Sequence, residues 1–296
     1  MTKTIHGKKK RFRILLLSVI PLLLLAFLVP GFFNSLKVVR YDIHADGFDH
    51  PVRIAFVTDL HSCAYGDGQR ELLDAIDAQR PDIVLLGGDI FDHRLPEDNA
   101  NAFLEQIGSR YPCYAVNGNH EYLSGAAAFR RRMEKLEACG VKRLSGETVT
   151  LEINGETLRI SGLDDPFAWQ NDRSFIEHSE GSFFRQLEDT AASADGGAFN
   201  VLLTHRPEYL DDYAQYAYDL VLSGHAHGGQ WRIPGIINGL WAPNQGLFPA
   251  YAGGRYDSGA LTMIVSRGLA RESTWLPRFY NRPELVIIEL SEDNGM

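Results

Sequence analysis

Residues 52–61 read VRIAFVTDLH and residues 83–92 read IVLLGGDIFD. Each segment begins with a short run of mostly apolar residues and continues directly into polar residues that include an aspartate. Such runs are typical of buried strands, and residues 69–79 between them have the apolar spacing of a helix. Together they predict a βαβ unit with parallel strands, whose polar residues lie at one edge of the sheet.

The remaining sequence extends this pattern and then departs from it. Asn154-Gly155 stands between two alternating segments, 148–153 and 157–161, which is the strongest local sign of an antiparallel hairpin. Helices are predicted over residues 99–107, 126–138 and 182–190, and further strands over residues 36–43, 111–116, 199–204, 220–223, 261–266 and 285–290. The chain of 296 residues is 45% hydrophobic, which suits one large α/β domain.

The N-terminal region predicts a membrane anchor. No charged residue lies between Arg13 and Lys37, and about 20 apolar residues match the roughly 30 Å hydrocarbon core of a bilayer. Basic residues are more frequent before this stretch than after it, so residues 1–13 are expected in the cytoplasm. We predict a transmembrane anchor over residues 14–35 and an extracytoplasmic domain over residues 36–296. The alternative is a cleaved signal peptide, whose apolar region is usually shorter.

The charge distribution argues against long nucleic acids as partners. The first 40 residues carry eight Lys or Arg and no Asp or Glu, so the net charge of −9 leaves −17 for the rest. So acidic a domain repels long nucleic acids, although bound metal ions would still attract a small phosphate ester. We expect a small phosphoester or an envelope-associated substrate, and no protein partner follows from the sequence.

The cysteines do not form a disulfide framework. Cys63, Cys113 and Cys139 are few and odd in number, so small buried side chains are expected. A bridge between Cys113 and Cys139 stays open, because the sequence gives no distance between them.

Five short motifs follow predicted strands and carry residue types that bind metals. They read DLH at 59–61, GGDIFD at 87–92, GNHE at 118–121, THRP at 204–207 and SGHAHGG at 223–229. Each alone is compatible with a turn, a helix cap or an exposed histidine. His225 and His227 are alternate residues, which point to opposite faces of an extended chain, so the chain must bend to bring both imidazoles to one site.

In this order the motifs resemble the signature of the calcineurin-like metallophosphoesterases, D-x-H, G-D-x-x-D, G-N-H-[DE], H and G-H-x-H, over residues 59–227. The predicted anchor and the chain length resemble the bacterial membrane-associated YkuE-like branch. The resemblance implies an α/β metallophosphoesterase sandwich of two mixed β-sheets packed face to face. Helices would flank the sheets, one transmembrane helix would precede them, and a dinuclear site would lie where the strands end.

The resemblance also implies two divalent transition-metal ions and their ligands. One ion would be held by Asp59, His61, Asp89 and His227, and the other by Asp89, Asn119, His205 and His225. Asp89 would bridge them, because a carboxylate has two oxygens and offsets the repulsion between cations about 3.5–4 Å apart. The nitrogen and oxygen ligands suit Mn, Fe, Zn, Ni or Co better than Ca, and they do not select one metal.

Two further residues acquire roles from the resemblance. His120 is the expected catalytic histidine, which donates a proton to the leaving oxygen or stabilises the charge of the transition state. Asp92 occupies the position expected to hold His120 in orientation. The metal ions would supply an activated water as nucleophile.

Four features depart from the signature or lie outside it. Cys63 is expected to be a small buried residue and not a ligand. Arg206 either contacts a substrate phosphate or forms a surface ion pair, and Glu121 replaces an aspartate without an expected consequence. The aromatic residues within 230–256 form a substrate wall, contact lipid headgroups or pack a long loop onto the sheet.

The sequence therefore predicts dinuclear-metal-dependent hydrolysis of a phosphodiester, phosphomonoester or pyrophosphate at the outer face of the cytoplasmic membrane. One alternative is a nuclease or cyclic-nucleotide phosphodiesterase on the same metal centre. A second alternative is a non-catalytic metal-binding envelope protein, which the retention of every ligand and of His120 disfavours.

Overall fold

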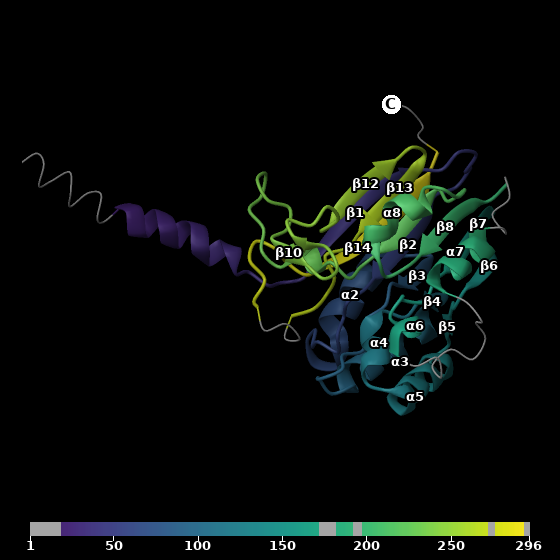
Figure 1. The fold of residues 1–296 in the computed structure, drawn as a ribbon, viewed down its shortest axis with the longest axis horizontal. Helices are drawn as coiled ribbons and strands as arrows, with labels where there is room; N and C mark the ends of the chain where they lie inside the picture. Colours follow the sequence, from purple (N-terminus) through teal and green to yellow (C-terminus); the bar gives the residue numbers. More distant parts are fainter. Residues whose placement is uncertain (1–18, 172–181, 192–196, 272–275, 293–296) are drawn as a thin grey trace, which may run out of the picture.

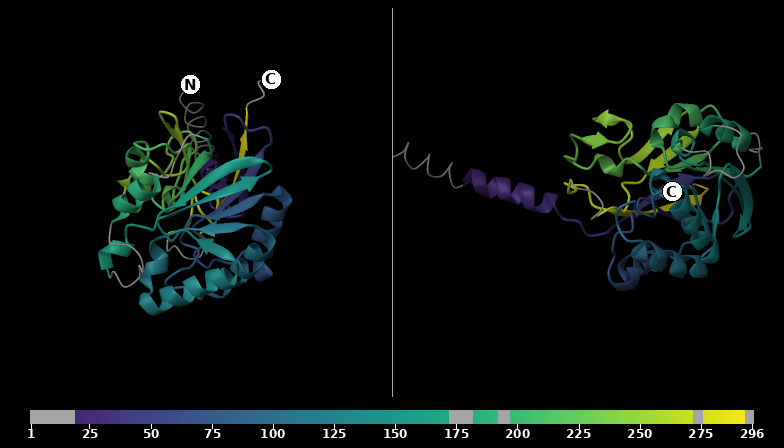
Figure 2. Two further views of the ribbon diagram at one scale, coloured as in Figure 1. Left: turned by 90° about the vertical axis from the view of Figure 1, so that its right-hand side faces the viewer. Right: turned by 60° about the horizontal axis from the view of Figure 1, so that its bottom comes forward.

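Two six-stranded mixed sheets form the centre of the protein, with helices on their outer faces (Figures 1 and 2). The computed structural model describes residues 19–171, 182–191, 197–271 and 276–292. Its architecture is the α/β sandwich of two mixed sheets that the motif pattern predicted, so that prediction is confirmed.

The first sheet has the strand order β1-β14-β2-β3-β4-β5. Its strands are β1 (Lys37–His44), β14 (Glu284–Ser291), β2 (Val52–Val57), β3 (Ile83–Leu86), β4 (Cys113–Ala115) and β5 (Val141–Arg143). The strands β2 to β5 are parallel, and β14 is parallel to β1 and antiparallel to β2. The carboxyl ends of β2, β3 and β4 therefore lie at the same edge.

The second sheet has the order β12-β13-β9-β8-β7-β6. Its strands are β12 (Gly254–Ser258), β13 (Leu261–Val265), β9 (Leu220–Ser223), β8 (Phe199–Leu203), β7 (Glu156–Gly162) and β6 (Glu147–Ile153). The middle four strands are parallel, while β12 and β6 are antiparallel at the two edges. Asn154 (φ 57°) and Gly155 (φ 95°) join β6 to β7 in the left-handed conformation that a two-residue hairpin turn requires.

Helices cover the outer face of each sheet. The first sheet carries α2 (Arg70–Gln79), α3 (Asp98–Arg110) and α5 (Ala126–Ala138), and the second carries α7 (Phe183–Ala191) and α8 (Leu210–Tyr213). Shorter elements are η1 (Asp67–Gln69), α4 (Asn119–Leu123), α6 (Ala168–Asn171), η3 (Pro207–Tyr209), η4 (His227–Gly229) and the small pair β10 (Trp241–Ala242) and β11 (Gly246–Leu247). In α2, Leu72, Leu73 and Ile76 are buried, as their spacing predicts.

The period of two along each strand decides which sheet face a residue meets. Ile54 and Phe56 of β2 point between the sheets and share a buried cluster with Ile160 and Leu203 of the second sheet. Ala55, the intervening residue, belongs instead to the cluster under the helices. Because β2 is buried on both faces, the polar residues that follow it are fixed between two packed layers.

A helix over residues 19–31 precedes β1 and projects from the sandwich (Figure 1). Tyr280 joins it to the domain, since its hydroxyl donates to the carbonyl of Phe27 (2.6 Å) and its backbone N–H to that of Gly31 (2.6 Å). No helix among the described residues is long and apolar enough to cross a membrane. Residues 14–18 of the predicted anchor lie outside the described residues.

All three cysteines are free. Cys63 and Cys113 are buried and Cys139 is partly exposed, which answers the open question of a Cys113–Cys139 bridge. Burial raises the pKa of Cys113 well above its ordinary value, so this thiol stays protonated.

Candidate metal centre

The loops that follow β2, β3, β8 and β9 meet at one edge between the sheets. Five of the predicted ligands adopt positive φ there, namely Asp59 (53°), His61 (48°), Asp89 (52°), His225 (66°) and His227 (47°). This conformation is uncommon for residues other than glycine, and strained residues cluster at functional sites. The positive φ values of His225 and His227 also bend the chain, so that both side chains reach the same edge.

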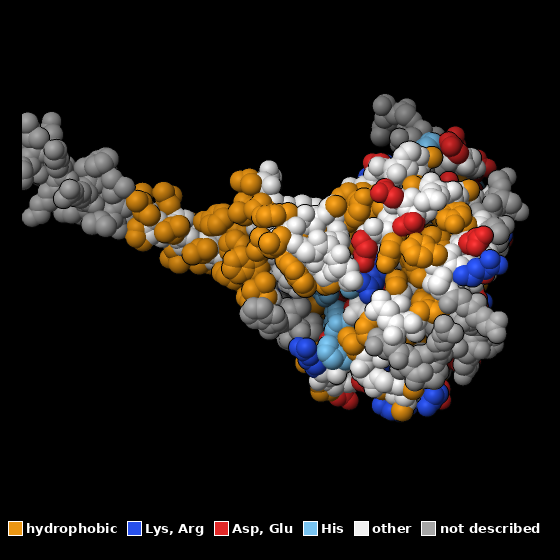
Figure 3. Space-filling view, viewed as in Figure 1, with side chains coloured by type: hydrophobic (Ala, Val, Ile, Leu, Met, Phe, Trp, Pro, Cys, Tyr) orange, Lys and Arg blue, Asp and Glu red, His pale blue; other side chains and the backbone are white. Residues whose placement is uncertain are grey.

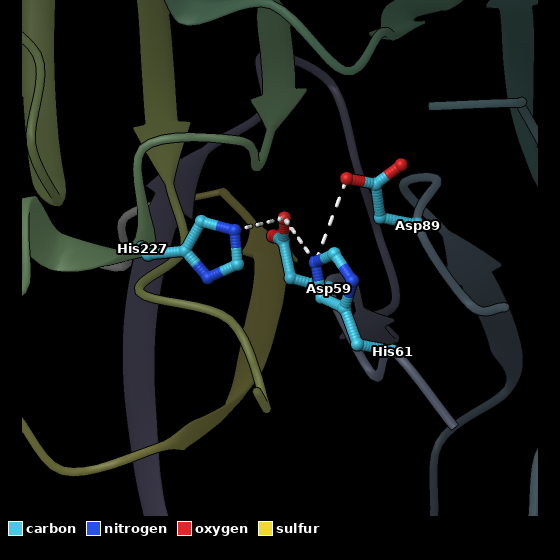
Figure 4. A group of neighbouring side chains, drawn as sticks. All are labelled: Asp59, His61, Asp89 and His227. Atoms are coloured by element: carbon cyan, nitrogen blue, oxygen red, sulfur yellow. Dashed lines mark ion pairs between the residues drawn. The ribbon is translucent and has the colours of Figure 1, made fainter. Parts of the chain in front are cut away.

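One cluster contains Asp59, His61, Asp89 and His227, all buried (Figure 4). His227 Nε2 lies 3.6 Å from Asp59 Oδ1, and His61 Nε2 lies 3.9 Å from the same oxygen. His61 Nε2 is also 3.5 Å from Asp89 Oδ2. In Figure 4 the side chains converge from three loops, one of which carries both Asp59 and His61, and Asp59 lies between the two imidazoles.

A second cluster shares Asp89 and adds His205 and His225. His205 Nε2 lies 3.1 Å from Asp89 Oδ2 and 3.3 Å from His225 Nδ1, so three ligand atoms face one point. His205 Nδ1 is 2.7 Å from the carbonyl of Gly87, a contact that orients the ring. Asn119, the first residue of α4, follows Gly118, which touches Asp89.

Unpaired buried atoms test whether these residues fit metal ions. His61 Nε2 and Asn119 Oδ1 are buried and have no hydrogen-bond partner among the described residues. Leaving such atoms unpaired is costly, so they require a partner that the protein itself does not supply. Both atoms belong to the predicted ligand set, His61 to that of one ion and Asn119 to that of the other. The residues therefore fit two ions with nitrogen and oxygen ligands.

Electrostatics favour the ligand forms of Asp89, His225 and His227, but not those of Asp59 and His205. Burial raises the pKa of Asp59, which favours its neutral acid. Burial raises the pKa of Asp89, but the charges of His205 and His120 hold it well below its ordinary value. Burial lowers the pKa values of His225 and His227 well below the ordinary value, so both imidazoles are neutral, the form that binds a metal. For His205 burial acts in the same direction, but Asp89 raises its pKa to about 10.

Asp92 lies beneath two histidines. Its Oδ2 is 3.0 Å from His61 Nδ1 and 3.2 Å from His120 Nδ1, so one carboxylate orients a predicted ligand and the predicted catalytic residue together. Its Oδ1 accepts the backbone N–H groups of Arg94 (2.7 Å) and Leu95 (3.0 Å). From the sequence, Asp92 was expected to orient only His120. The structure adds its contact with His61.

His120 is the reachable member of the site. Its side chain is 20% exposed, whereas the side chains of His61, His205 and His227 are between 0% and 9% exposed. Its backbone N–H donates to Asp89 Oδ1 (2.8 Å), and its Nδ1 lies 3.0 Å from Nδ1 of His93. Burial lowers the pKa of His120, but the nearby carboxylates of Asp89 and Asp92 raise it above the ordinary value. These carboxylates therefore favour the protonated form of this imidazole, which faces the open side of the site.

Glu121 holds the loop of the shared aspartate. The buried carboxylate accepts backbone N–H groups from Asp89 (2.9 Å), Phe91 (3.1 Å) and Gly118 (2.7 Å). A Cβ atom on Gly118 would lie 2.2 Å from Asp89 Oδ1, so only glycine leaves room for the carboxylate. Sequence reasoning missed this role, although a glutamate at the third position of a helix is a recognised sign of capping.

Arg132 extends the same support from α5. This buried guanidinium donates to the backbone carbonyls of Asp92 (2.7 Å) and His120 (3.1 Å) and pairs with Glu97 (2.8 Å). No local pattern in the sequence indicated this residue, because its partners lie 12 to 40 positions away in the chain.

Arg206 is buried beside the second cluster. The interpretation of this residue as part of a surface ion pair is therefore wrong. Its guanidinium pairs with Asp165, and its Nη1 lies 2.8 Å from His225 Nε2. Asn244 Oδ1 also lies 2.9 Å from His225 Nε2. Arg206 and Asn244 therefore border the nitrogen of His225 that faces away from His205.

Cys63 does not enter the site. Its side chain is buried, and its sulfur accepts the backbone N–H of Arg271 (3.2 Å). The prediction of a small buried residue is confirmed.

Two mixed sheets with neighbouring histidine and carboxylate clusters at their strand ends define a metal-dependent hydrolase. Residues 52–229 match the family model of the calcineurin-like phosphoesterases. Because this match covers more than half of the chain, the protein belongs to that family and is a metallophosphoesterase.

Bacterial relatives extend the similarity over most of the chain. The uncharacterized metallophosphoesterase YkuE of Bacillus subtilis (strain 168) is 25% identical over 90% of this chain and 83% of its own length. YkoQ of the same organism is 31% identical over 74% of this chain and 79% of its own. Phosphodiesterase YaeI of Escherichia coli (strain K12) is 26% identical over 88% of this chain and 89% of its own length.

Solved structures support the fold alone. The NAD nucleotidase NadN of Haemophilus influenzae superposes with a TM-score of 0.50 at 15% identity, covering 75% of this chain and 46% of its own. A 5′-nucleotidase precursor of Thermus thermophilus superposes with a TM-score of 0.50 at 14% identity, covering 82% of this chain and 55% of its own. The chain thus spans about half the length of these two proteins.

Proposed function

We propose that the protein hydrolyses a phosphodiester with two transition-metal ions held by the two clusters. The observation that carries this proposal is the pair of buried clusters that share Asp89. We assign Asp59, His61, Asp89 and His227 to one ion and Asp89, Asn119, His205 and His225 to the other. When bound, such ions polarise the phosphoryl oxygens and lower the pKa of water so that it attacks phosphorus.

The protein's own groups orient the substrate and move a proton. His120 is exposed on the open side of the site and is placed to give its proton to the leaving oxygen. Asp92 fixes the ring of His120 and stabilises its cationic form. No nucleophilic side chain is required, so the ester is cleaved in one displacement.

The choice of a phosphodiester over a monoester or pyrophosphate is supported by one relative. YaeI, similar over 88% of the chain, is named a phosphodiesterase. A nuclease remains the weaker alternative, because the net charge of −17 beyond residue 40 repels long polyanions.

The test uses the full chain purified in detergent, stripped of metal and reloaded with Mn, Fe, Zn, Ni or Co. Turnover of bis-p-nitrophenyl phosphate is compared with that of p-nitrophenyl phosphate, for the unmodified protein and for Asp89→Asn. Exposed Asp74 on α2 supplies the matched control, Asp74→Asn. We expect metal-dependent cleavage of the diester, lost in Asp89→Asn and retained in the control.

Three results would contradict the proposal. Stoichiometric metal binding without turnover of either ester would favour a metal-binding protein, and faster turnover of the monoester would replace the diesterase assignment. Failure of the folded protein to bind metal would remove the ligand assignment.

We further propose that residues 14–35 anchor the protein and that the catalytic domain lies outside the cytoplasm. The uncharged stretch after the basic residues 8–13 supports this, and so do the exposed apolar side chains of the helix at 19–31. Alkaline phosphatase fused after residue 296 should be active, because it folds only outside the cytoplasm. An inactive fusion with an active cytoplasmic reporter at the same position would reverse the orientation.

A further inference from the structure

Residues 231–248, which we name the apolar lobe, follow the metal-binding histidines directly. Its exposed large apolar side chains are Trp231, Ile236, Trp241, Leu247 and Phe248. Leu247 is 68% exposed and Phe248 is 64% exposed. Arg232 is the only charged residue in this segment of an acidic chain. Soluble proteins rarely expose so many large apolar residues together, and such patches mark binding surfaces.

The apolar lobe is continuous with the helix at 19–31. The ring of Phe279 lies 5.4 Å from that of Trp231 in the lobe, and 5.9 Å and 5.0 Å from those of Phe27 and Phe32. A cavity of about 310 Å³ between the helix and the lobe is lined by Phe27, Phe32, Trp231, Ile237 and Leu240 among others. Figure 3 shows the resulting hydrophobic surface, which runs from the helix onto the adjoining side of the domain.

The exposed residues of the helix indicate what covers this surface. Leu22, Leu23, Leu24 and Leu25 are consecutive, so they point to all sides of the helix, and each is exposed. A helix that is apolar all round is stable in lipid and not in water. Because the lobe adjoins this helix, a bilayer that holds the proposed anchor would begin at the level of the lobe. Tryptophans such as Trp241, which is 48% exposed, prefer that level, where a polar N–H and an apolar ring are both accommodated.

The lobe is also coupled to the metal centre. Leu240 donates its backbone N–H to the carbonyl of Gly229 (3.0 Å), two residues after the ligand His227. Asn244, between β10 and β11, contacts His225 and Arg206. The segment that meets the bilayer therefore also supplies one border of the site.

We propose that the apolar lobe enters the interfacial layer of a lipid bilayer, and that the site acts on the phosphodiester headgroup of a lipid in that layer. The second part rests on the proposed phosphoesterase function, whereas the first part rests on the exposed apolar surface and on the proposed anchor. The occupant of the surface is the lipid bilayer, in which a headgroup phosphate lies at the depth that a lobe-anchored site can reach.

The first experiment measures the depth of the lobe in the full chain, reconstituted in vesicles of phosphatidylcholine and phosphatidylglycerol in equal parts. A bimane fluorophore is attached at Phe248→Cys, or at Phe184→Cys as the matched control. Phe184 is an exposed phenylalanine on α7, at the side of the domain opposite β10 in Figure 1. Cys139→Ser removes the partly exposed cysteine from both proteins.

Quenching by lipids that carry a spin label on the acyl chain decides the proposal. We expect strong quenching at position 248 and none at position 184. Equal accessibility of both positions to a water-soluble quencher, without lipid quenching at 248, would overturn the membrane contact. A dimer formed through the lobe would instead shield position 248 from both quenchers, and this result would also overturn it.

The second experiment tests the substrate class. Full-length protein in the same vesicles is given dioleoylglycerol p-nitrophenyl phosphate, a lipid phosphodiester, or soluble bis-p-nitrophenyl phosphate. The double substitution Leu247→Gln and Phe248→Gln should lower cleavage of the lipid ester about tenfold and leave the soluble ester unchanged. Phe184→Gln should change neither rate.

The two proposals fail in different ways. Equal cleavage of the lipid ester by the double variant and the unmodified protein would overturn the lipid substrate and leave the phosphoesterase function intact. Absence of turnover on both esters would overturn the proposed function and with it the lipid substrate, while the quenching result would still decide the membrane contact.

Discussion

Glu121 stabilises the loop that carries the shared aspartate by accepting three backbone N–H groups. Glu121→Gln keeps the size of the side chain but places an amide donor against one of these N–H groups. We expect a loss of roughly 1–3 kcal/mol in unfolding free energy and a fall in metal affinity of about ten- to hundredfold. Chemical denaturation and calorimetric metal titration measure the two effects.

Exposed Glu134 on α5 supplies the matched control for that substitution. Glu134→Gln should change neither quantity. If Glu121→Gln bound metal as tightly as the unmodified protein, the carboxylate would contribute to stability and not to metal affinity.

Substitution of His120 distinguishes a role in proton transfer from a role in metal binding. His120→Ala should lower kcat by about a hundredfold to ten-thousandfold, because the leaving oxygen loses its proton donor. Metal content should stay at two ions, since our ligand assignment excludes this side chain. Activity assays with elemental analysis of the same sample decide the point, and loss of one ion would make His120 a ligand.

The sequence indicated the residues that lie together in the two clusters more completely than their surroundings. The motif residues are found near one another because each follows a strand, and parallel strands end at one edge. Asp165, Arg132 and Asn244 carried no comparable signal, because each contacts the site from a distant segment whose placement depends on packing. Local patterns do not report such contacts.

At the level of elements, the sequence pattern located the buried strands and the long helices and missed two edge strands. Strand β9 and helix α5 have the predicted bounds, and the strand predicted at 111–116 is shorter, Cys113–Ala115. The unpredicted β5 and β12 are edge strands of 3 and 5 residues. The three residues of β5 are too short for a repeating pattern, and β12 mixes glycine with polar residues, which are depleted in strands.

The hairpin between β6 and β7 offers a test of its turn. Gly155 has φ 95°, and a Cβ atom there would meet nothing within 4 Å, so Gly155→Ala is disfavoured by the backbone alone. We expect a loss of about 1 kcal/mol in unfolding free energy. The control is Gly197→Ala, at a glycine with open space and without positive φ. Denaturation curves compare the two, and equal stability would contradict the turn assignment.

At the scale of the molecule, the metal centre connects the two sheets. Asp59 and Asp89 follow strands of the first sheet, whereas His205 and His225 follow strands of the second. Ions held between them should resist separation of the layers. Free metal at a hundred times its Kd should add about 2.7 kcal/mol to the unfolding free energy.

Thermal unfolding with and without a chelator measures this stabilisation, and hydrogen exchange locates it. Asp89→Asn, which lacks the shared ligand, should unfold at the same temperature under both conditions. Metal protection confined to one sheet would contradict a connection between the layers.

The position of β14 has a consequence for the order of events during synthesis. Residues 284–291 lie between β1 and β2, so the first sheet stays divided until this late segment has left the ribosome. The loop of Asp59 also depends on late residues, since Leu269 donates its backbone N–H to the carbonyl of Thr58 (3.1 Å). Nascent chains are therefore expected to remain incompletely folded during translation, the state in which a polypeptide is threaded through a translocation channel.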